Sequence, residues 1–596
     1  MNEYQLRKVL ESGGQLDPYT NTDASGGINQ RYNGRALAEN EFVLLQNADI
    51  SVPGKRTKRL GPANPGSPRI EPATGSYATV GMICFTVNFT ESIIIAAAYS
   101  QGGTTGLYRT YDCINFILLP GATPNVTGYC NMQVAANYVG SPFTSASIIY
   151  IIDAVGSLYA TDGNTVAAIT LLDVGNNPIT GLQDMTWFMN QMFYVGGSFC
   201  WFSNINEPTT IQNAAVNVAL GDGSNLRRVF AYRDGQLILF KYGTSGTQGS
   251  IHLLDVSSGT PSQYQLNTQP LFDGLNMCSP RCVTRMGFDV NAEVVFATLE
   301  GLRTDAFTAL DRLITPSLPF TQNVPDLVSS ITPYALDAAF TMFWNDELLW
   351  FVPINDSLTP NYVVAYQTKV PKQDELQGIT FMDGEETTPG PLTNMAATCA
   401  TIGSINGNPP ALLFAAVVQV FYGPIRQAFY QDNGETYTEI SRRVDHGIPL
   451  NEKEGLKLGV MLDTDHVGAI DVQINFDDGT YQTVGTYAPT GGVNLPCNLP
   501  VSFDGNQEFT ALFDLHFDSP ANPTAINPAM NGNLKRYMDA EVQISSTSLP
   551  SILGWYLQSA AIPVRWQSLN SPIPNLNDDA TPVEPQTVPA GVVAWE

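Results

Sequence analysis

The chain has 596 residues, of which 43% are hydrophobic and only 14% are charged, and it contains 51 glycines and 40 prolines. This composition excludes a disordered or mainly helical chain and is typical of a loop-rich β protein with roughly two to four domains. The net charge of −27 argues against a protein that grips nucleic acid or anionic lipid over its surface, because acidic groups repel phosphates.

The first residues, Met1 to Gly13, lack the apolar core of a signal peptide, and no stretch reaches the ~18 apolar residues of a membrane span. We therefore expect a protein without a membrane anchor that stays in the cytosol unless a particle carries it out on lysis. The eight cysteines show no paired spacing, and no histidine completes a zinc site with Cys278 and Cys282. We expect buried free thiols and no cofactor or metal.

Residues 1–75 form an N-terminal segment with nine basic and eight acidic residues, so the excess negative charge lies in the rest of the chain. The pattern predicts a short helix over residues 3–12 and an extended stretch at Ala24–Arg31. Apolar residues recur at helical spacing in Ala36–Asn47, which favours a second helical piece.

A basic run follows at Lys55, Arg56, Lys58 and Arg59, between turns rich in proline and glycine. One interpretation is a nucleic-acid or sorting signal. The other is a solvated strand edge, or a set of ion-pair partners for acidic neighbours, and the short length of the run favours it.

The stretch Met185–Phe202 consists of three short apolar runs separated by Asn190-Gln191 and Gly196-Gly197. Asparagine and glycine tolerate the positive φ angles of hairpin turns, so the stretch predicts a three-stranded meander. A lone meander leaves apolar faces uncovered and requires neighbours of the same kind. Similar blocks begin near Tyr77, Thr127, Gln183, Arg227, Arg281, Tyr334 and Met395.

Meanders repeated every ~44 to 61 residues favour a β-propeller over residues 76–430, with six or seven irregular blades. A pair of stacked β-sandwiches is the alternative. We expect Trp187 and Trp201 to pack between blades, so that replacing either one by alanine costs ~3 to 5 kcal/mol of stability.

Beyond the propeller the pattern changes to strict alternation of apolar and polar residues, for example in Ala469–Tyr481 and Met538–Ser545. Alternation is typical of antiparallel strands with one wet face, so residues 431–570 predict a β-sandwich-like domain. The proline-rich, acidic residues 571–596 predict an extended tail that orders only on a partner or a neighbouring subunit.

Candidate catalytic groups are few. Asp463–His466 and Asp514–Asp518 place carboxylates beside a histidine, but both fit solvent-facing positions of strands or turns. Tyr108–Phe116 and Thr161–Val166 resemble the Asp-box turns of sialidase-type propellers, which are structural turns even in enzymes. No arginine triad with a tyrosine and a glutamate is evident, so we expect no catalysis.

The N-terminal segment carries a more specific likeness. The ordered set Gly26–Arg31, Leu37–Glu41, Leu45–Asp49 and Lys58–Gly61 resembles the opening of the tail nozzle family of short-tailed bacteriophages, also called tail tubular protein B. Further weak matches follow along the chain, at Trp187–Gly196, Trp201–Pro208, Val294–Arg303, Asp432–Gly434 and Ser441–Arg443.

This resemblance implies an all-β chain in which a propeller is attached to a platform domain built from the N-terminal segment and the C-terminal strands. It also implies a ring, usually of six subunits, in the virion tail, assembled in the host cytoplasm below an adaptor ring and the portal. Tail fibres or tail-tip proteins are further expected partners. The basic run at Lys55, Arg56, Lys58 and Arg59 is then a candidate docking site for a partner.

The function that we expect is therefore structural: a nozzle through which double-stranded genomic DNA is retained and ejected without specific binding. A carbohydrate-binding or glycan-cleaving propeller at the tail tip is the alternative. A propeller scaffold from a cell is a third possibility, and it predicts a monomer.

Overall fold

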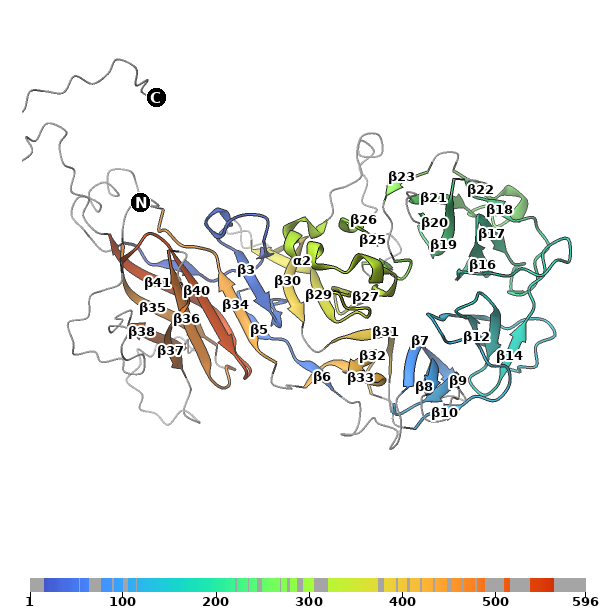
Figure 1. Ribbon diagram of the computed structural model, residues 1–596, viewed down its shortest axis with the longest axis horizontal. Helices are drawn as coiled ribbons and strands as arrows, with labels where there is room; N and C mark the ends of the chain where they lie inside the picture. Colours follow the sequence, from blue (N-terminus) through green and yellow to red (C-terminus); the bar gives the residue numbers. More distant parts are fainter. Residues whose placement is uncertain are drawn as a thin grey trace, which may run out of the picture.

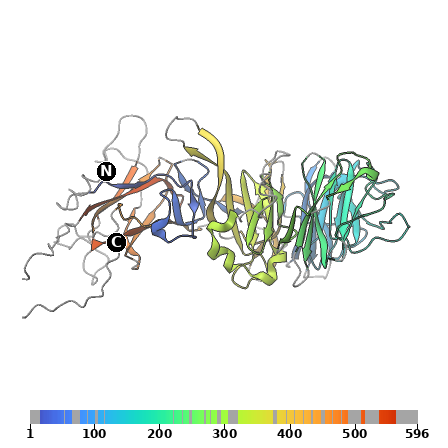
Figure 2. The same ribbon diagram turned by 90° about the horizontal axis from the view of Figure 1, so that it is seen from above.

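The computed structural model describes residues 16–561, with gaps at 53, 64–76, 88–89, 100–104, 114, 220–221, 234, 244–248, 268–269, 276–278, 287–292, 305–319, 374–379, 393–394, 405–407, 419–420, 432–434, 448–452, 464, 478–479, 488–508 and 515–535. The helix expected over residues 3–12 and the tail expected over 571–596 lie outside the described residues. Figures 1 and 2 show two bodies side by side along the long axis, a ring of small sheets and a pair of larger sheets.

The ring is a β-propeller of seven blades, each a small antiparallel sheet, so the predicted fold class is confirmed and the blade count is seven. The first three blades follow one another in chain order. They are β7 Tyr77–Val87, β8 Thr90–Tyr99, β9 Thr105–Thr110 and β10 Ile117–Leu118; β11 Asn131–Ala136, β12 Ser147–Ile152, β13 Leu158–Thr161 and β14 Val166–Ile169; and β15 Asp184–Phe188, β16 Gln191–Gly196, β17 Phe199–Phe202 and β18 Val216–Asn217.

The remaining four blades complete the ring. They are β19 Ser224–Ala231, β20 Gln236–Gly243, β21 Gly249–Asp255, β22 Gln265–Leu266 and β23 Phe272–Leu275; β24 Val283–Arg285, β25 Val294–Thr298 and β26 Gly301–Thr304; β27 Phe340–Trp344, β28 Glu347–Val352, β29 Tyr362–Gln373 and β30 Thr380–Leu392; and β31 Ala397–Gly403, β32 Ala411–Val418 and β33 Phe421–Gln431, with β6 Gly61–Ala63 at the edge.

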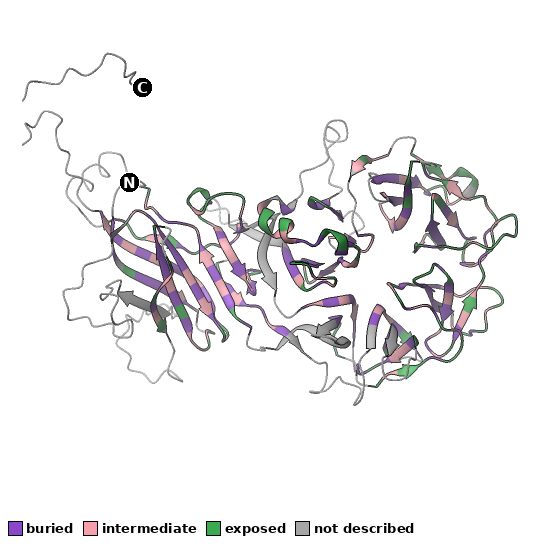
Figure 3. Ribbon diagram, in the orientation of Figure 1, coloured by how far each residue is buried: buried purple, intermediate pink, exposed green. Residues whose placement is uncertain are grey.

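Each blade is held by apolar side chains on both of its faces. In β12, Ile149 and Ile151 join the hydrophobic cluster shared with the first blade, whereas Ile148, Tyr150 and Ile152 join the cluster shared with the third. Successive strand residues point to opposite faces, so a continuous apolar run serves both junctions. The central strands of the blades are therefore apolar along their length. Strands β16 and β28 are buried at every residue, and Figure 3 colours such strands purple.

The ring is closed. A hydrophobic cluster spans every pair of neighbouring blades, including the last and the first, where Leu413 and Ala415 pack with Ile93 and Ile95. The N-terminal strand β6 adds to the last blade by pairing with β33. Closure by a strand from the other end of the chain protects the sheet edge and ties residues 61–63 to residues 421–431.

The second body, here called the platform, is a β-sandwich with strands from both ends of the chain. One sheet has the order β38-β35-β41-β5-β4, with β1 on β41 and β39 on β35, and the other has the order β2-β3-β34-β40-β36-β37. The N-terminal strands are β1 Tyr19–Asn21, β2 Gly27–Ile28, β3 Glu41–Gln46, β4 Ala48–Asp49 and β5 Arg56–Lys58. The C-terminal strands are β34 Tyr437–Ser441, β35 Lys453–Leu462, β36 Ile470–Phe476, β37 Gln482–Tyr487, β38 Phe509–Asp514, β39 Arg536–Tyr537, β40 Ala540–Ser546 and β41 Ser551–Ala561.

The helical piece expected in Ala36–Asn47 is wrong. Only the short 3₁₀ turn η1 Gly34–Ala36 is helical, and the apolar residues lie on strand β3, where Phe42 and Leu45 are fully buried in the sandwich core. The strand pairs with β34 through a register shift between Phe42 and Leu44. The shift places the residues of an irregular strand at a spacing that resembles that of a helix.

Helical structure is short elsewhere in the described residues as well: η2 Pro261–Gln263, η4 Phe320–Asn323, α2 Pro325–Ser330 and η5 Pro333–Ala338. The last three lie in the connection between the fifth and sixth blades, beside the platform (Figure 1). No helix in the described part of the chain has the length and apolarity to cross a membrane.

The tryptophans of the third blade pack as expected but are less buried than expected. Trp187 and Trp201 are both partly buried and lie against the cluster between the second and third blades. We therefore expect Trp187→Ala to cost about 2 kcal/mol, below the ~3 to 5 kcal/mol of a full core truncation such as Trp350→Ala. Urea unfolding of both variants measures the difference, and a Trp187→Ala cost equal to that of Trp350→Ala would contradict the partial burial.

His446 makes the platform sensitive to acid. Burial, and then the neighbouring Lys453, lower the pKa of His446 to about 4, and its Nε2 has no hydrogen-bond partner. The unfolded chain takes up this proton near pH 6.5 and the folded chain only near pH 4, so stability falls as the pH drops from 6.5 to 4. We expect that the His446→Asn variant loses about 1 to 3 kcal/mol less stability than the unchanged chain over this pH range.

Asparagine is the suitable replacement because His446 has a φ of 53°, a conformation that asparagine tolerates. Chemical denaturation at pH 7 and pH 4.5 measures the effect. Equal acid sensitivity of the two proteins would show that other groups cause it.

Candidate functional site: the centre of the propeller

The basic run singled out in the sequence lies inside the protein. Arg56 is fully buried in the platform, where its Nε donates to Glu439 at 2.9 Å. Lys58 donates to the Thr547 carbonyl at 2.8 Å. These contacts join β5 to the C-terminal strands.

The other two cations of the run also have internal partners. Arg59 forms a bidentate ion pair with Glu347 of β28, so it links the platform segment to the sixth blade. Lys55 lies 2.8 Å from Asp463 and 2.6 Å from Asp465. The structure thus gives Lys55, Arg56, Lys58 and Arg59 the role of ion-pair and hydrogen-bond partners within the chain. The hypothesis that they dock a partner is not carried forward, because three of the four are buried.

The histidine motifs also have structural explanations where they are described. His466 accepts a hydrogen bond from the Ser551 backbone N–H at Nδ1, at 3.2 Å, and its Nε2 lies 3.0 Å from the Gly468 carbonyl. Both ring nitrogens are therefore occupied. Of Asp514–Asp518, only Asp514 is described.

The Asp-box-like segments form turns. Asp112 accepts a hydrogen bond from the Asn115 backbone at 2.8 Å, and Asp162 accepts from the Asn164 and Thr165 backbones. Each carboxylate stabilises its own turn. Within the described ranges, no group of three or more His, Cys, Asp or Glu side chains is placed to hold a metal ion.

A cavity of about 220 Å³ with several polar side chains on its wall lies at the centre of the propeller. Its wall is built from the first strands of six blades, β7, β11, β19, β24, β27 and β31, together with the residues just before β11 and β24. The first strand of each blade is an end strand of its sheet, and these strands face one another across the ring (Figure 1). Residues that are far apart in the sequence meet here.

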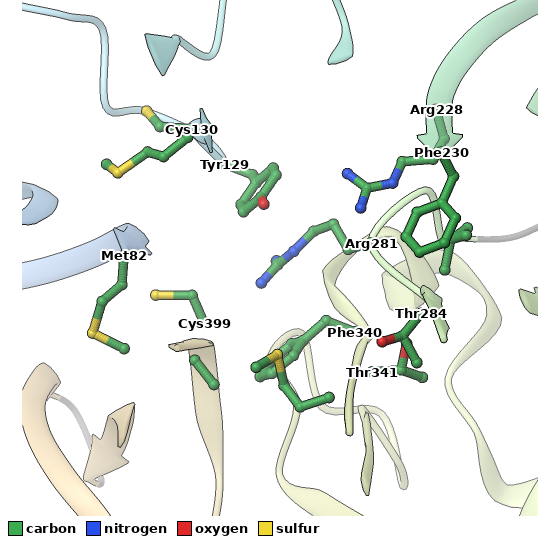
Figure 4. Close-up of a pocket in the computed structure, with 14 residues that line it drawn as sticks. Met82, Tyr129, Cys130, Arg228, Phe230, Arg281, Thr284, Phe340, Thr341 and Cys399 are labelled. Atoms are coloured by element: carbon green, nitrogen blue, oxygen red, sulfur yellow. The ribbon is translucent and has the colours of Figure 1, made fainter. Parts of the chain in front are cut away.

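Two arginines and a tyrosine converge on this space. Figure 4 shows the side chains of Arg228, Arg281 and Tyr129 directed toward one another from three parts of the ring. The remaining wall is largely apolar or weakly polar, and includes Phe230 and Phe340.

Asp184, the first residue of β15, contacts Arg228 but does not itself line the cavity. Its carboxylate is 1% exposed, lies 3.0 Å from Arg228 Nη1, and accepts the Val229 backbone N–H at 2.7 Å. Asn131 donates to the same carboxylate. Burial raises the pKa of Asp184, while Arg228 and the backbone donors oppose the rise. The ion pair fixes the guanidinium of Arg228 at the cavity wall.

Arg281 is held differently. Its guanidinium donates to the Ala338 carbonyl at 3.2 Å and to the Thr398 carbonyl, and it lies 4.3 Å from the Tyr129 ring centroid and 4.9 Å from that of Phe340. Two aromatic faces thus stabilise the cation. No carboxylate among the described residues forms an ion pair with it.

The cysteine prediction holds for the described chain. Cys84, Cys113, Cys130, Cys200, Cys282 and Cys399 are free thiols, and all but Cys84 are buried. Burial raises the pKa of Cys399, on the cavity wall, to about 11, although Arg281 lies nearby. The thiol is therefore protonated at neutral pH and a poor nucleophile.

No protein-family model matches this sequence, and no curated protein matches it. Solved structures do. An exo-β-1,3-galactanase from Phanerochaete chrysosporium with galactose is 10% identical, over 65% of this chain and 98% of that one, with a TM-score of 0.24. A glycoside hydrolase is 11% identical over 81% and 99%, with a TM-score of 0.24, and Kluyveromyces lactis Hsv2 is 9% identical over 69% and 99%, with a TM-score of 0.29.

These comparisons correct one expectation from the sequence. We expected a chain without catalysis, but the similar structures include a galactanase and a glycoside hydrolase, so that expectation is not retained. At such low identity and TM-score the likeness assigns neither protein's activity to this chain. Most glycosidases place two carboxylates across the scissile bond, whereas no carboxylate lines this cavity in the described residues.

Proposed function

We propose that this chain is a structural protein of a short bacteriophage tail, where copies of it form a ring-shaped nozzle for the genomic DNA. One observation carries the proposal. The nozzle resemblance of the N-terminal segment implies a propeller attached to a platform built from both ends of the chain, and the chain has a propeller and a sandwich of that composition.

The connection between the two bodies supports a role as a rigid tube wall. The segment from β5 to β6 contributes to both, and the buried Arg59–Glu347 pair fixes the platform segment to the sixth blade. Strand β30 of that blade also contacts β2 and β3. A tube wall under the pressure of packaged DNA needs such coupling between its parts.

The charge supports passage of DNA. The net charge of −27 repels phosphates over about one Debye length, ~8 to 10 Å at physiological salt, so double-stranded DNA passes an acidic wall without binding to it. We propose that the ring lies in the virion tail, below the portal and its adaptor ring, with tail fibres or tail-tip proteins as outer partners.

The second candidate is a carbohydrate-binding or glycan-cleaving propeller at the tail tip. The specific observation in its favour is the central cavity, where aromatic rings and two arginines surround an enclosed space. Release of sugars from host glycans by the purified chain, lost in a cavity variant, would favour this candidate over the nozzle.

Mass photometry of the purified full chain tests the proposal. A nozzle protein forms a discrete species with a mass that is a small multiple of the chain's 64.6 kDa, six copies being the expected number. A monomer at micromolar concentration, with no larger species when the concentration is raised, would count against the nozzle and favour a scaffold propeller.

A further inference from the structure

The central cavity concentrates positive charge in a strongly acidic protein. Of the two arginines on its wall, Arg228 is neutralised by Asp184 at 3.0 Å. Arg281 has carbonyl and aromatic partners but no carboxylate partner among the described residues. Arg228, Asp184 and Arg281 together therefore carry a net charge of +1, although the net charge of the whole chain is −27. A partly buried cation without a carboxylate partner favours an anionic ligand.

Buried polar atoms on the same wall also have no partner. Thr341 is 5% exposed, and its hydroxyl oxygen forms no hydrogen bond. The Nε of Arg228 is buried and also unpaired. A buried polar group without a hydrogen bond is destabilising, so a ligand atom that paired with these two groups would stabilise the cavity.

Tyr129 adds a neutral donor. Its side chain lines the cavity at the centre of the ring, beside Arg228 and Arg281 (Figure 4). Burial raises its pKa, in spite of the nearby Arg281 and Arg228. The phenol therefore stays protonated at neutral pH and is available to donate a hydrogen bond.

The size and the walls of the cavity limit the ligand. Its volume of about 220 Å³ is below the ~300 to 1,000 Å³ of pockets for drug-sized molecules. The rings of Phe230 and Phe340 and the side chains of Met82 and Met132 provide apolar surface. A single small ring fits within a space of this volume.

We propose that the central cavity binds a small molecule that carries one carboxylate on a single ring. The planar carboxylate lies against Arg281, with Tyr129 as a second donor, and the ring lies against the apolar side chains of Met82, Met132 and Phe230. Arginine suits this role because its planar guanidinium matches a carboxylate. The inference concerns binding alone, and it is independent of whether the chain assembles into a nozzle.

Titration calorimetry on the full chain tests the proposal with four probes. Benzoate and glucuronate carry the carboxylate on an aromatic ring and on a sugar ring, and benzyl alcohol and glucose are their neutral counterparts. We expect one of the two acids to bind at least tenfold more tightly than its neutral counterpart. Which acid binds distinguishes an aromatic acid from a sugar acid as the natural source of the carboxylate.

The variants are Arg281→Gln, Arg281→Lys and the matched control Arg227→Gln. Arg227 precedes Arg228 on β19 but pairs with the exposed Asp337 at 3.4 Å and does not line the cavity. We expect Arg281→Gln to weaken binding of the acid at least tenfold, Arg281→Lys to weaken it less, and Arg227→Gln to leave it unchanged. Circular dichroism identifies variants that do not fold. If Arg281→Gln does not fold, Arg281→Lys takes its place in the comparison.

Three results would overturn the proposal. They are no binding of either acid at millimolar concentration, equal binding of an acid and its neutral counterpart, and an equal loss of binding in the Arg227 and Arg281 variants. The first excludes a carboxylate site. The second indicates an apolar cavity only, and the third places the binding elsewhere.

Discussion

Replacing Glu347 by leucine lowers the free energy of unfolding by about 3 to 5 kcal/mol, because it removes the bidentate carboxylate partner of the buried Arg59 guanidinium. Both side chains are almost fully buried, at 7% and 4% exposure, and the pair is bidentate. It joins the segment after β5 to the sixth blade, so the same change also loosens the propeller from the platform. Denaturant unfolding measures the first effect, and limited proteolysis between the two bodies measures the second.

The double variant Arg59→Met/Glu347→Leu separates charge from packing. Removing both charges from a buried pair is often neutral or stabilising, so we expect the double variant to recover most of the loss. Losses that simply add in the double variant would contradict an interaction between these two residues. A Glu347→Leu cost below 1 kcal/mol would show that the pair is hydrated in solution.

Replacing Asp184 by alanine has a similarly large effect, about 3 to 5 kcal/mol, at the centre of the ring. The change leaves Arg228 without its counter-ion and removes the acceptor for the Val229 backbone N–H. The loss of the Val229 acceptor adds a buried unsatisfied group to the unpaired charge. Thermal and urea unfolding measure the effect.

Asp337→Ala is the matched control for this variant. Asp337 pairs with Arg227, the residue next to Arg228, but the Asp337 side chain is 66% exposed and the distance is 3.4 Å. We expect this change to cost less than ~1 kcal/mol, as for other exposed pairs. Similar costs for the two aspartates would contradict the special position of Asp184.

The regular part of the fold follows from the sequence. The blocks predicted to begin near Tyr77, Gln183 and Arg281 start within two residues of β7, β15 and β24, because turn residues separate short apolar runs there. The strands that follow them, such as β16 and β25, are buried along their length between blades, which makes their apolar runs conspicuous. The alternation of apolar and polar residues in β36 and β40 also predicts these strands, because one face of each strand packs on the sandwich core.

The pairing of strands and charges that are far apart in the chain could not be predicted from the sequence in the same way. Strand β6 has three residues and is defined only by its partner β33, more than 350 residues later in the chain. The roles of Arg56 and Arg59 depend on Glu439 and Glu347, which lie 383 and 288 residues away. A short basic run has the same sequence pattern whether its side chains are exposed or buried. The sequence alone does not show which acidic residues lie beside it in the folded chain.

The central cavity was missed for the same reason. Its residues come from six strands and from the residues just before two of them, and they carry no local motif, so no spacing in the sequence brings Arg228, Arg281 and Tyr129 together. A partial signal existed at Asp184. A carboxylate directly before the buried run of β15 and β16 is unusual unless a cation or backbone donors satisfy it.

We propose that copies of this chain surround a passage for DNA. Electron microscopy of the purified full chain, in negative stain and at several concentrations, tests this arrangement. We expect rings of identical subunits around a central hole, with each subunit divided into a propeller and a platform. Single two-lobed particles at every concentration would contradict it.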